Sequence, residues 1–150
     1  MTDSLTPAAA FKVQVTIDCV DPSAMARFWN LALGYVEQQP PPGFGSWDEF
    51  ADSINLPADE RSATGSSVDP AGVGPRLLFQ RVPEPKVVKN RLHLDVSAGA
   101  GFSGDERVAA VRSHAQRLVQ AGATIVAERS DEFSWWIVLT DIEGNEFCLQ

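Results

Sequence analysis

Hydrophobic and polar residues alternate in the first part of the chain as they do in a β-strand with one buried face. Between positions 11 and 20 an apolar residue falls on every second place. Asp21 and Pro22 follow as a helix N-cap and a proline suited to the first helical turn. Apolar residues then recur at intervals of three and four up to Gly34, which is a stop signal. The pattern predicts a strand followed by an amphipathic helix.

The periodic signal weakens between positions 35 and 74, where prolines, glycines and a stretch rich in serine and threonine interrupt it. Spaced aromatic and aliphatic residues within 47–54 indicate at least one helical turn. A strand is predicted over 76–82. The segment 83–85 contains two prolines and is typical of a linker, because proline cannot continue a central strand.

The second half of the chain repeats this order of elements. Ser103 and Glu106 have capping-box spacing at the start of a second amphipathic helix, and 141–145 has the composition of a hairpin turn. The predicted elements are a strand over 91–96, a helix over 103–121, and strands over 124–128, 135–140 and 146–150.

The two halves also align with each other residue by residue. In this alignment Gln14 lies over His93, and Gln80 lies over Cys148. Each half contains a sheet whose inner face needs a partner, so the repetition indicates an internal duplication. The sequence therefore predicts an α+β fold of two tandem βαβββ modules. The predicted single domain spans 1–150, with module one over about 11–83, a linker over about 84–89 and module two over about 90–150.

Composition argues against several classes of partner. The chain has 150 residues, of which 20 are acidic and 12 are basic, and its formal net charge is -8. An acidic surface repels phosphate backbones and anionic lipids, so neither nucleic acid nor a membrane is an expected partner. The N-terminus is polar, no long apolar run occurs, and the two cysteines lie outside any zinc-binding spacing. These features predict a cytoplasmic protein with reduced thiols.

Several short motifs together resemble a known family. They are QVTIDCVD at 14–21 leading to FW at 28–29 and LGY at 33–35, LFQRVP at 78–83, NRLHLDV at 90–96, and DIEGNEFC at 141–148. In this order the chain resembles the glyoxalase/bleomycin resistance/dioxygenase (vicinal oxygen chelate) superfamily, in its glyoxalase-like domain subgroup, over about residues 11 to 150. The resemblance implies that the two modules form a curled mixed sheet around an open cavity. It also implies a divalent metal held by the first and last strands of each module.

By position, the metal-binding places of the family fall on Gln14, Gln80, His93 and Cys148. The family's Gly-Asn-x-x-Glu pattern would put a glutamate at position 148, so this set lacks carboxylates. Amide oxygens do not balance the charge of Mg²⁺ or Mn²⁺, whereas a histidine and a deprotonated cysteine suit zinc or iron. No cofactor is therefore predicted outright, and a divalent metal (Zn, Fe, Ni or Mn) stays open. Classical glyoxalase I activity is not expected, because in the family it uses a metal-bound glutamate as base.

Strand alternation places His93 and Gln14 on one polar stripe, each between apolar neighbours. His93 is a candidate general base or hydrogen-bond donor, and a structural histidine is the alternative. Glu146 shares a face with Cys148 and is a candidate catalytic carboxylate at the cavity mouth, with an ordinary solvated carboxylate as the alternative. For Cys148 the alternative to ligand binding is a small buried apolar residue.

Trp135 and Trp136 are adjacent on one predicted strand, so their side chains face opposite sides. One of them is expected to line the cavity, and the other is expected to pack on a helix or an interface. An aromatic wall of this kind suits a flat or amphiphilic small molecule.

Three functions follow from these residues. The leading interpretation is a protein that binds a small molecule in a cavity between the modules. That cavity would be lined by Gln14, Gln80, His93, Cys148 and one of Trp135 and Trp136. The alternative is a metal-dependent lyase, isomerase or dioxygenase, in which His93 and Cys148, helped by Glu146, hold the ion. The third is an interaction domain that forms a homodimer through exposed sheet edges.

Overall fold

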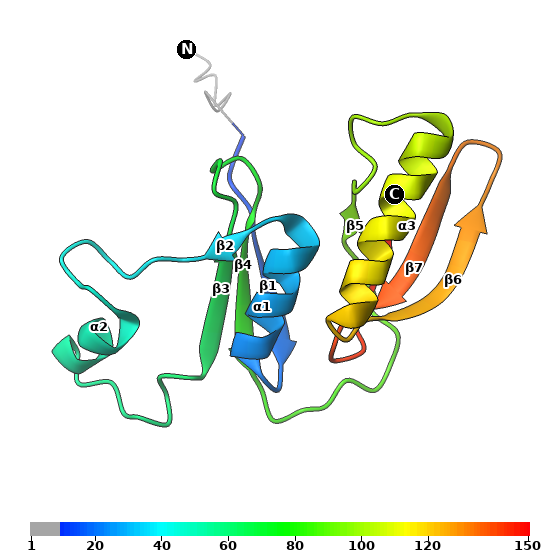
Figure 1. The fold of residues 1–150 in the computed structure, drawn as a ribbon. Helices are drawn as coiled ribbons and strands as arrows, with labels where there is room; N and C mark the ends of the chain where they lie inside the picture. Colours follow the sequence, from blue (N-terminus) through cyan, green and yellow to red (C-terminus); the bar gives the residue numbers. More distant parts are fainter. Residues whose placement is uncertain (1–9) are drawn as a thin grey trace, which may run out of the picture.

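The computed structural model describes residues 10–150, which form two α+β halves lying side by side (Figure 1). The first half contains β1 (Gln14–Cys19), α1 (Pro22–Leu33), β2 (Val36–Glu37), α2 (Trp47–Ser53), β3 (Thr64–Val68) and β4 (Arg76–Arg81). The second half contains β5 (Asp95–Val96), α3 (Gly104–Gln120), β6 (Thr124–Ser130), β7 (Trp135–Thr140) and β8 (Glu146–Leu149). The α+β fold of two tandem βαβββ modules is thereby confirmed, with α2 as an addition to the first module.

Each half has its own four-stranded mixed sheet. The strand orders are β1-β4-β3-β2 and β5-β8-β7-β6, so the two sheets have the same topology. In each sheet the two strands that come first and last along the chain, β1 with β4 and β5 with β8, pair in parallel. The remaining neighbours are antiparallel. The two sheets are separate and not closed, which places β1 and β5 at sheet edges that face the other half.

Helix α1 begins and ends where its sequence signals predict. The side chain of Asp21 accepts a hydrogen bond from the backbone N–H of Ala24, and Pro22 occupies the first turn. Gly34 ends the helix with a φ of 70°, a left-handed conformation that glycine adopts without steric cost. The buried face of α1 packs on β3 and β4 and includes Phe28 and Trp29.

Helix α3 covers the second sheet, but its predicted capping box is not formed. Ser103 occupies the N-cap position, but its side chain accepts no capping hydrogen bond. Gly104, the first helical residue, has a φ of 52°, outside the right-handed helical region, so the start of the helix departs from capping-box geometry. Val111, Ala115 and Leu118 form the buried face.

Contacts between the halves join them into one core. Trp29 Nε1 donates a hydrogen bond to Asp141 Oδ2 at 3.2 Å, and both residues are buried. The backbone N–H of Val20 donates to Glu143 Oε1 at 2.6 Å. The Trp29 ring also lies 5.0 Å from the ring of Phe147. Helix α1 is therefore tied to the β7–β8 hairpin of the other half.

One strand is much shorter than the sequence predicts. The strand predicted over 91–96 is regular only in β5, and the preceding residues 90–94 form an irregular segment. The weak region 35–74 contains β2, α2 and β3.

Among the described residues, no helix is long and apolar enough to cross a membrane.

Candidate functional site

A cavity of about 410 Å³ lies between edge strand β1 and the irregular segment 90–94. We call it the inter-module cavity. Its apolar lining comprises Val13, Val15, Ile17, Trp29, Leu92 and Leu94. Its polar lining comprises Gln14, Thr16, Asn90, His93, Asn145 and Glu146. A hollow of this size that combines apolar walls with polar groups has the character of a small-molecule site.

The amide of Gln14 is held in place at the cavity wall. Arg76 Nη1 donates a hydrogen bond to Gln14 Oε1 at 2.7 Å, and Gln14 Nε2 donates to Thr16 Oγ1 at 3.3 Å. Arg76 is the residue opposite Gln14 on β4, so the parallel register of the two strands creates this contact. Gln14 therefore presents an oriented amide with its oxygen already engaged.

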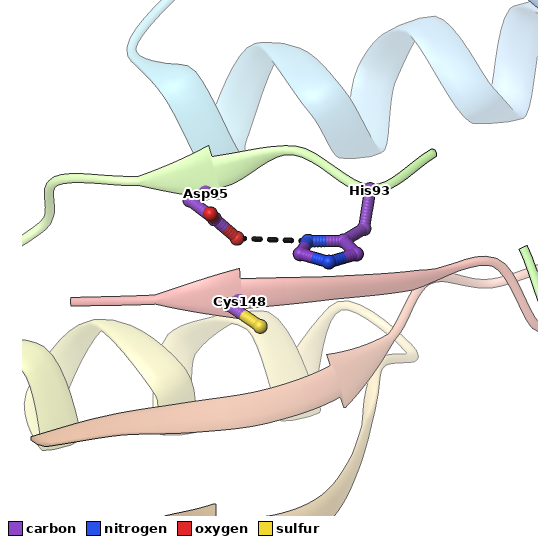
Figure 2. A group of neighbouring side chains, drawn as sticks. All are labelled: His93, Asp95 and Cys148. Carbon is purple, nitrogen blue, oxygen red and sulfur yellow. Dashed lines mark hydrogen bonds and ion pairs between the residues drawn. The ribbon is translucent and has the colours of Figure 1, made fainter. Parts of the chain in front are cut away.

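His93, Asp95 and Cys148 form a second feature at the same seam (Figure 2). One nitrogen, oxygen or sulfur atom from each residue lies within 4.8 Å of the others. His93 Nδ1 lies 2.9 Å from Asp95 Oδ1, and both side chains are nearly half exposed. Asp95 and Cys148 are direct neighbours because β5 and β8 pair in parallel. This register brings together donors more than 50 residues apart in the sequence.

The thiol of Cys148 is protonated at neutral pH. Burial, together with the negative charge of Asp95 and a hydrogen bond to that carboxylate, raises its pKa to about 11. A protonated thiol is a poor nucleophile, so Cys148 does not act as an activated catalytic cysteine in this environment.

Glu146 lines the cavity, but its carboxylate is already engaged. Asn90 donates its backbone N–H to Glu146 Oε2 at 2.9 Å, and Lys86 Nζ lies 3.3 Å from the same oxygen. The hydrogen bond from Asn90, with help from Lys86, lowers the pKa of Glu146 below the ordinary glutamate value. A lowered pKa weakens a general base. Glu146 is better placed to anchor the connecting segment 86–90 beside the cavity.

Gln80 lies away from Gln14 and outside the lining of the inter-module cavity. Its partner on β1 is Asp18, whereas the partner of Gln14 on β4 is Arg76. Four residues along a strand separate the two positions, which is about 13 Å at ~3.3 Å per residue. The structure therefore does not bring Gln14 and Gln80 together around one ion.

The hairpin turns show how the last strand of one module, β4, aligns with the last strand of the other, β8. This alignment differs from the one predicted from the sequence. Asp69 and Asp141 each open a turn whose first carbonyl accepts a hydrogen bond from a glycine three residues later. Cys148 pairs with the residue three places before Asp141, and Leu78 pairs with the residue three places before Asp69. Leu78, not Gln80, is thus the counterpart of Cys148. It has no metal-binding atom in its side chain.

The two adjacent tryptophans face opposite sides of the second sheet. The guanidinium carbon of Arg112, on α3, lies 5.4 Å from the centre of the Trp135 ring, which places Trp135 on the helix-covered face. Trp136 pairs with Arg129 of β6. Neither ring is part of the cavity lining, whereas Trp29 of α1 forms part of it. The tryptophan at the cavity is therefore a different one from the predicted pair.

The donor set of His93, Asp95 and Cys148 suits a borderline metal ion. An imidazole nitrogen, a carboxylate oxygen and the sulfur of a cysteine that loses its proton on binding match zinc or iron better than Mg²⁺ or Mn²⁺, which prefer oxygen ligands. Three protein ligands is also the number that catalytic zinc sites use. Asp95 was missed in the sequence, although its position two residues after His93 on the strand predicted over 91–96 would place both on the same face.

Comparison with known proteins agrees with this architecture. The family model described as "Glyoxalase-like domain" matches residues 14–150. No curated protein matches the chain. Three solved structures illustrate the similarity. The fosfomycin resistance protein FosX from Mesorhizobium loti is 13% identical, with a TM-score of 0.62 over 95% of this chain and 91% of that one.

A glyoxalase/bleomycin resistance protein/dioxygenase family enzyme from Burkholderia phytofirmans PsJN is 21% identical, with a TM-score of 0.57 over 91% of this chain and 94% of that one. A mutant FosX from Listeria monocytogenes, complexed with Mn(II) and 1S,2S-dihydroxypropylphosphonic acid, is 11% identical. Its TM-score is 0.56 over 95% of this chain and 90% of that one. At these identities the structures show a shared fold.

Proposed function

This chain belongs to the glyoxalase-like domain family, and from that premise we propose that it binds a small molecule in the inter-module cavity. The observation that carries the proposal is the cavity itself, about 410 Å³ in volume and lined by six apolar and six polar residues. Its polar groups come from both modules, with Gln14 on one wall and His93 on the other. Such a site gives affinity through apolar burial and orientation through a few hydrogen bonds.

The test fills the cavity with a larger side chain at an exposed position, so that no buried core residue is changed. Thr16 lines the cavity and is exposed on β1, so Thr16→Trp adds an aromatic ring inside the hollow. Thr124→Trp is the matched control, because Thr124 is exposed on β6, the strand farthest from β5 in its sheet. A small-molecule library is screened by thermal shift, and hits are checked by native mass spectrometry.

We expect compounds that stabilise the wild-type protein and the Thr124→Trp variant but not the Thr16→Trp variant. A ligand present at a free concentration of a hundred times its Kd adds about 2.7 kcal/mol of stability, which a thermal-shift assay detects readily. Hits that stabilise all three proteins equally would place binding elsewhere and refute the proposal.

A second candidate function is a metal-dependent lyase, isomerase or dioxygenase, and the cluster of His93, Asp95 and Cys148 favours it. The chemistry supplied by an ion held there would be polarisation of a substrate oxygen. The Listeria FosX structure, which contains Mn(II), makes manganese one of the ions to test. The sulfur donor favours zinc or iron over manganese.

Elemental analysis after incubation with Zn²⁺, Fe²⁺, Mn²⁺ and Ni²⁺, followed by desalting, separates this candidate from the first. We expect near-stoichiometric metal in the wild-type protein and its loss in Asp95→Ala. The matched control is Asp18→Ala, which removes an exposed aspartate from β1 of the other module. A wild-type protein that retains none of the four ions would eliminate the metal-dependent function and leave the small-molecule proposal standing.

A further inference from the structure

We propose that the ligand of the inter-module cavity is an amphiphile whose apolar body lies in the cavity and whose anionic group lies against Lys89 and Arg91. This inference rests on the proposed function and adds the chemical class of the ligand. It comes from a second hollow of about 190 Å³ lined by Lys89, Asn90, Arg91 and His93. We call it the basic hollow.

The basic hollow adjoins the inter-module cavity. Asn90 and His93 line both, so the two hollows lie next to each other at these residues. The segment 90–94 supplies the shared wall. Apolar residues Leu92 and Leu94 face the cavity, while Lys89 and Arg91 line only the basic hollow. One short segment therefore separates an apolar compartment from a positively charged one.

The positive charge of the basic hollow stands out in an acidic protein. The net charge of the chain is -8. In the part of the chain that the structure describes, neither Lys89 nor Arg91 forms an ion pair. Their charges are thus available to a ligand, and an arginine fork suits a carboxylate, sulfonate or phosphate group.

The carboxylates of Glu146 and Asp95 contact residues that line the basic hollow, and each has a partner. Glu146 is neutralised by Lys86 at 3.3 Å and receives the backbone N–H of Asn90. Asp95 faces His93 at 2.9 Å. Neither carboxylate lines the basic hollow itself. The local balance of charge there therefore favours an anion despite the acidic surface elsewhere.

A pair of fluorescent probes tests the inference. 8-Anilinonaphthalene-1-sulfonate carries a sulfonate, and N-phenyl-1-naphthylamine has the same aromatic body without the charge. Both gain fluorescence when the rings leave water. Binding is titrated to the wild-type protein, to the double variant Lys89→Gln/Arg91→Gln, and to Thr16→Trp. Arg129→Gln is the charge control, since Arg129 is exposed on β6 and lines neither hollow.

We expect the double variant to weaken binding of the anionic probe by about tenfold, the effect of losing charge-assisted contacts to a partly exposed anion. The neutral probe should bind the double variant and the wild-type protein equally, and Arg129→Gln should change neither probe. Added salt should reduce the difference between the probes, because both basic side chains are exposed to solvent.

The outcomes distinguish the anionic character of the ligand from binding in the inter-module cavity. Equal loss or no loss of both probes in the double variant would overturn the anionic class while leaving the cavity as a binding site. Failure of both probes to bind the wild-type protein, or undiminished binding of both to Thr16→Trp, would overturn the proposed function itself. Circular dichroism of every variant confirms that the fold is retained.

Discussion

Replacing Trp29 with phenylalanine tests the contact that holds the two modules at a set distance and so shapes the inter-module cavity. The indole of Trp29 lies on α1 of the first module and lines the cavity, and its Nε1 donates to Asp141 in the second module at 3.2 Å. Trp29→Phe removes this donor and leaves the Asp141 carboxylate buried, with only 3% of its surface exposed. The perturbation therefore removes a hydrogen bond between the modules and part of the cavity lining together.

The expected loss of stability is about 3 kcal/mol. Loss of a buried hydrogen bond to a charged group costs ~1.5–3 kcal/mol, and the space left by the smaller ring adds about 1 kcal/mol. Asn145 Nδ2 still donates to Asp141 Oδ2 at 3.0 Å, which limits the cost of the lost donor. For a chain of 150 residues, about 3 kcal/mol corresponds to a fall in Tm of about 10 °C.

Urea unfolding followed by far-ultraviolet circular dichroism measures the change, and Trp47→Phe is the matched control. Trp47 also donates its indole N–H, to the backbone oxygen of Gln38 at 2.8 Å, but its side chain is 39% exposed. Water replaces the lost partner there, so this control should cost less than ~1 kcal/mol. A Trp29→Phe variant no less stable than the Trp47→Phe variant would refute the view that the contact with Asp141 joins the modules.

Three further outcomes are expected elsewhere in the molecule. Gly65→Ala should lower the free energy of unfolding by ~1–3 kcal/mol, because a Cβ there would lie 2.6 Å from the carbonyl oxygen of Pro22; urea unfolding measures this. A backbone hydrogen bond from Gly74, with others from the same turn, lowers the pKa of Asp69. Its contribution to stability is therefore present above about pH 4 and lost as pH falls through the lowered pKa, so Asp69→Asn should flatten the acid dependence of urea unfolding. Burial raises the pKa of Cys19 to about 11, and peptide mapping should show its alkylation at about pH 8 to be roughly 100-fold slower than that of a peptide thiol. Alkylation at the rate of a free thiol would contradict the buried placement.

Local signals located most of the regular structure. Helix α1 lies between Asp21 and Gly34 as predicted, because a cap and a stop signal act over only a few residues. The strand over Trp135–Thr140 has the predicted bounds. A similar local signal was missed at α2, where Ser46 accepts a hydrogen bond from the N–H of Glu49. The Ser-x-x-Glu spacing was visible there, inside the region of weak periodicity.

The site was predictable only in part. His93 and Gln14 do line one cavity, as the polar stripe on two aligned strands indicated. Asp95 joins His93 through the same strand alternation, and it was overlooked as a candidate ligand. The engagement of Glu146 by Asn90, a residue 56 positions away, had no signal in the local pattern.

The sequence by itself determined the order of elements, the internal duplication and the family, because periodicity, caps and short motifs depend on neighbouring residues. Only the tertiary structure decided the strand register, which pairs Asp95 with Cys148 and makes Leu78 the counterpart of Cys148 in place of Gln80. It also decided that the cavity opens between two sheet edges with Trp29 in its lining. Register and inter-module packing depend on contacts between residues far apart in the chain, and a shift of two residues preserves every local pattern while exchanging the side chains that meet.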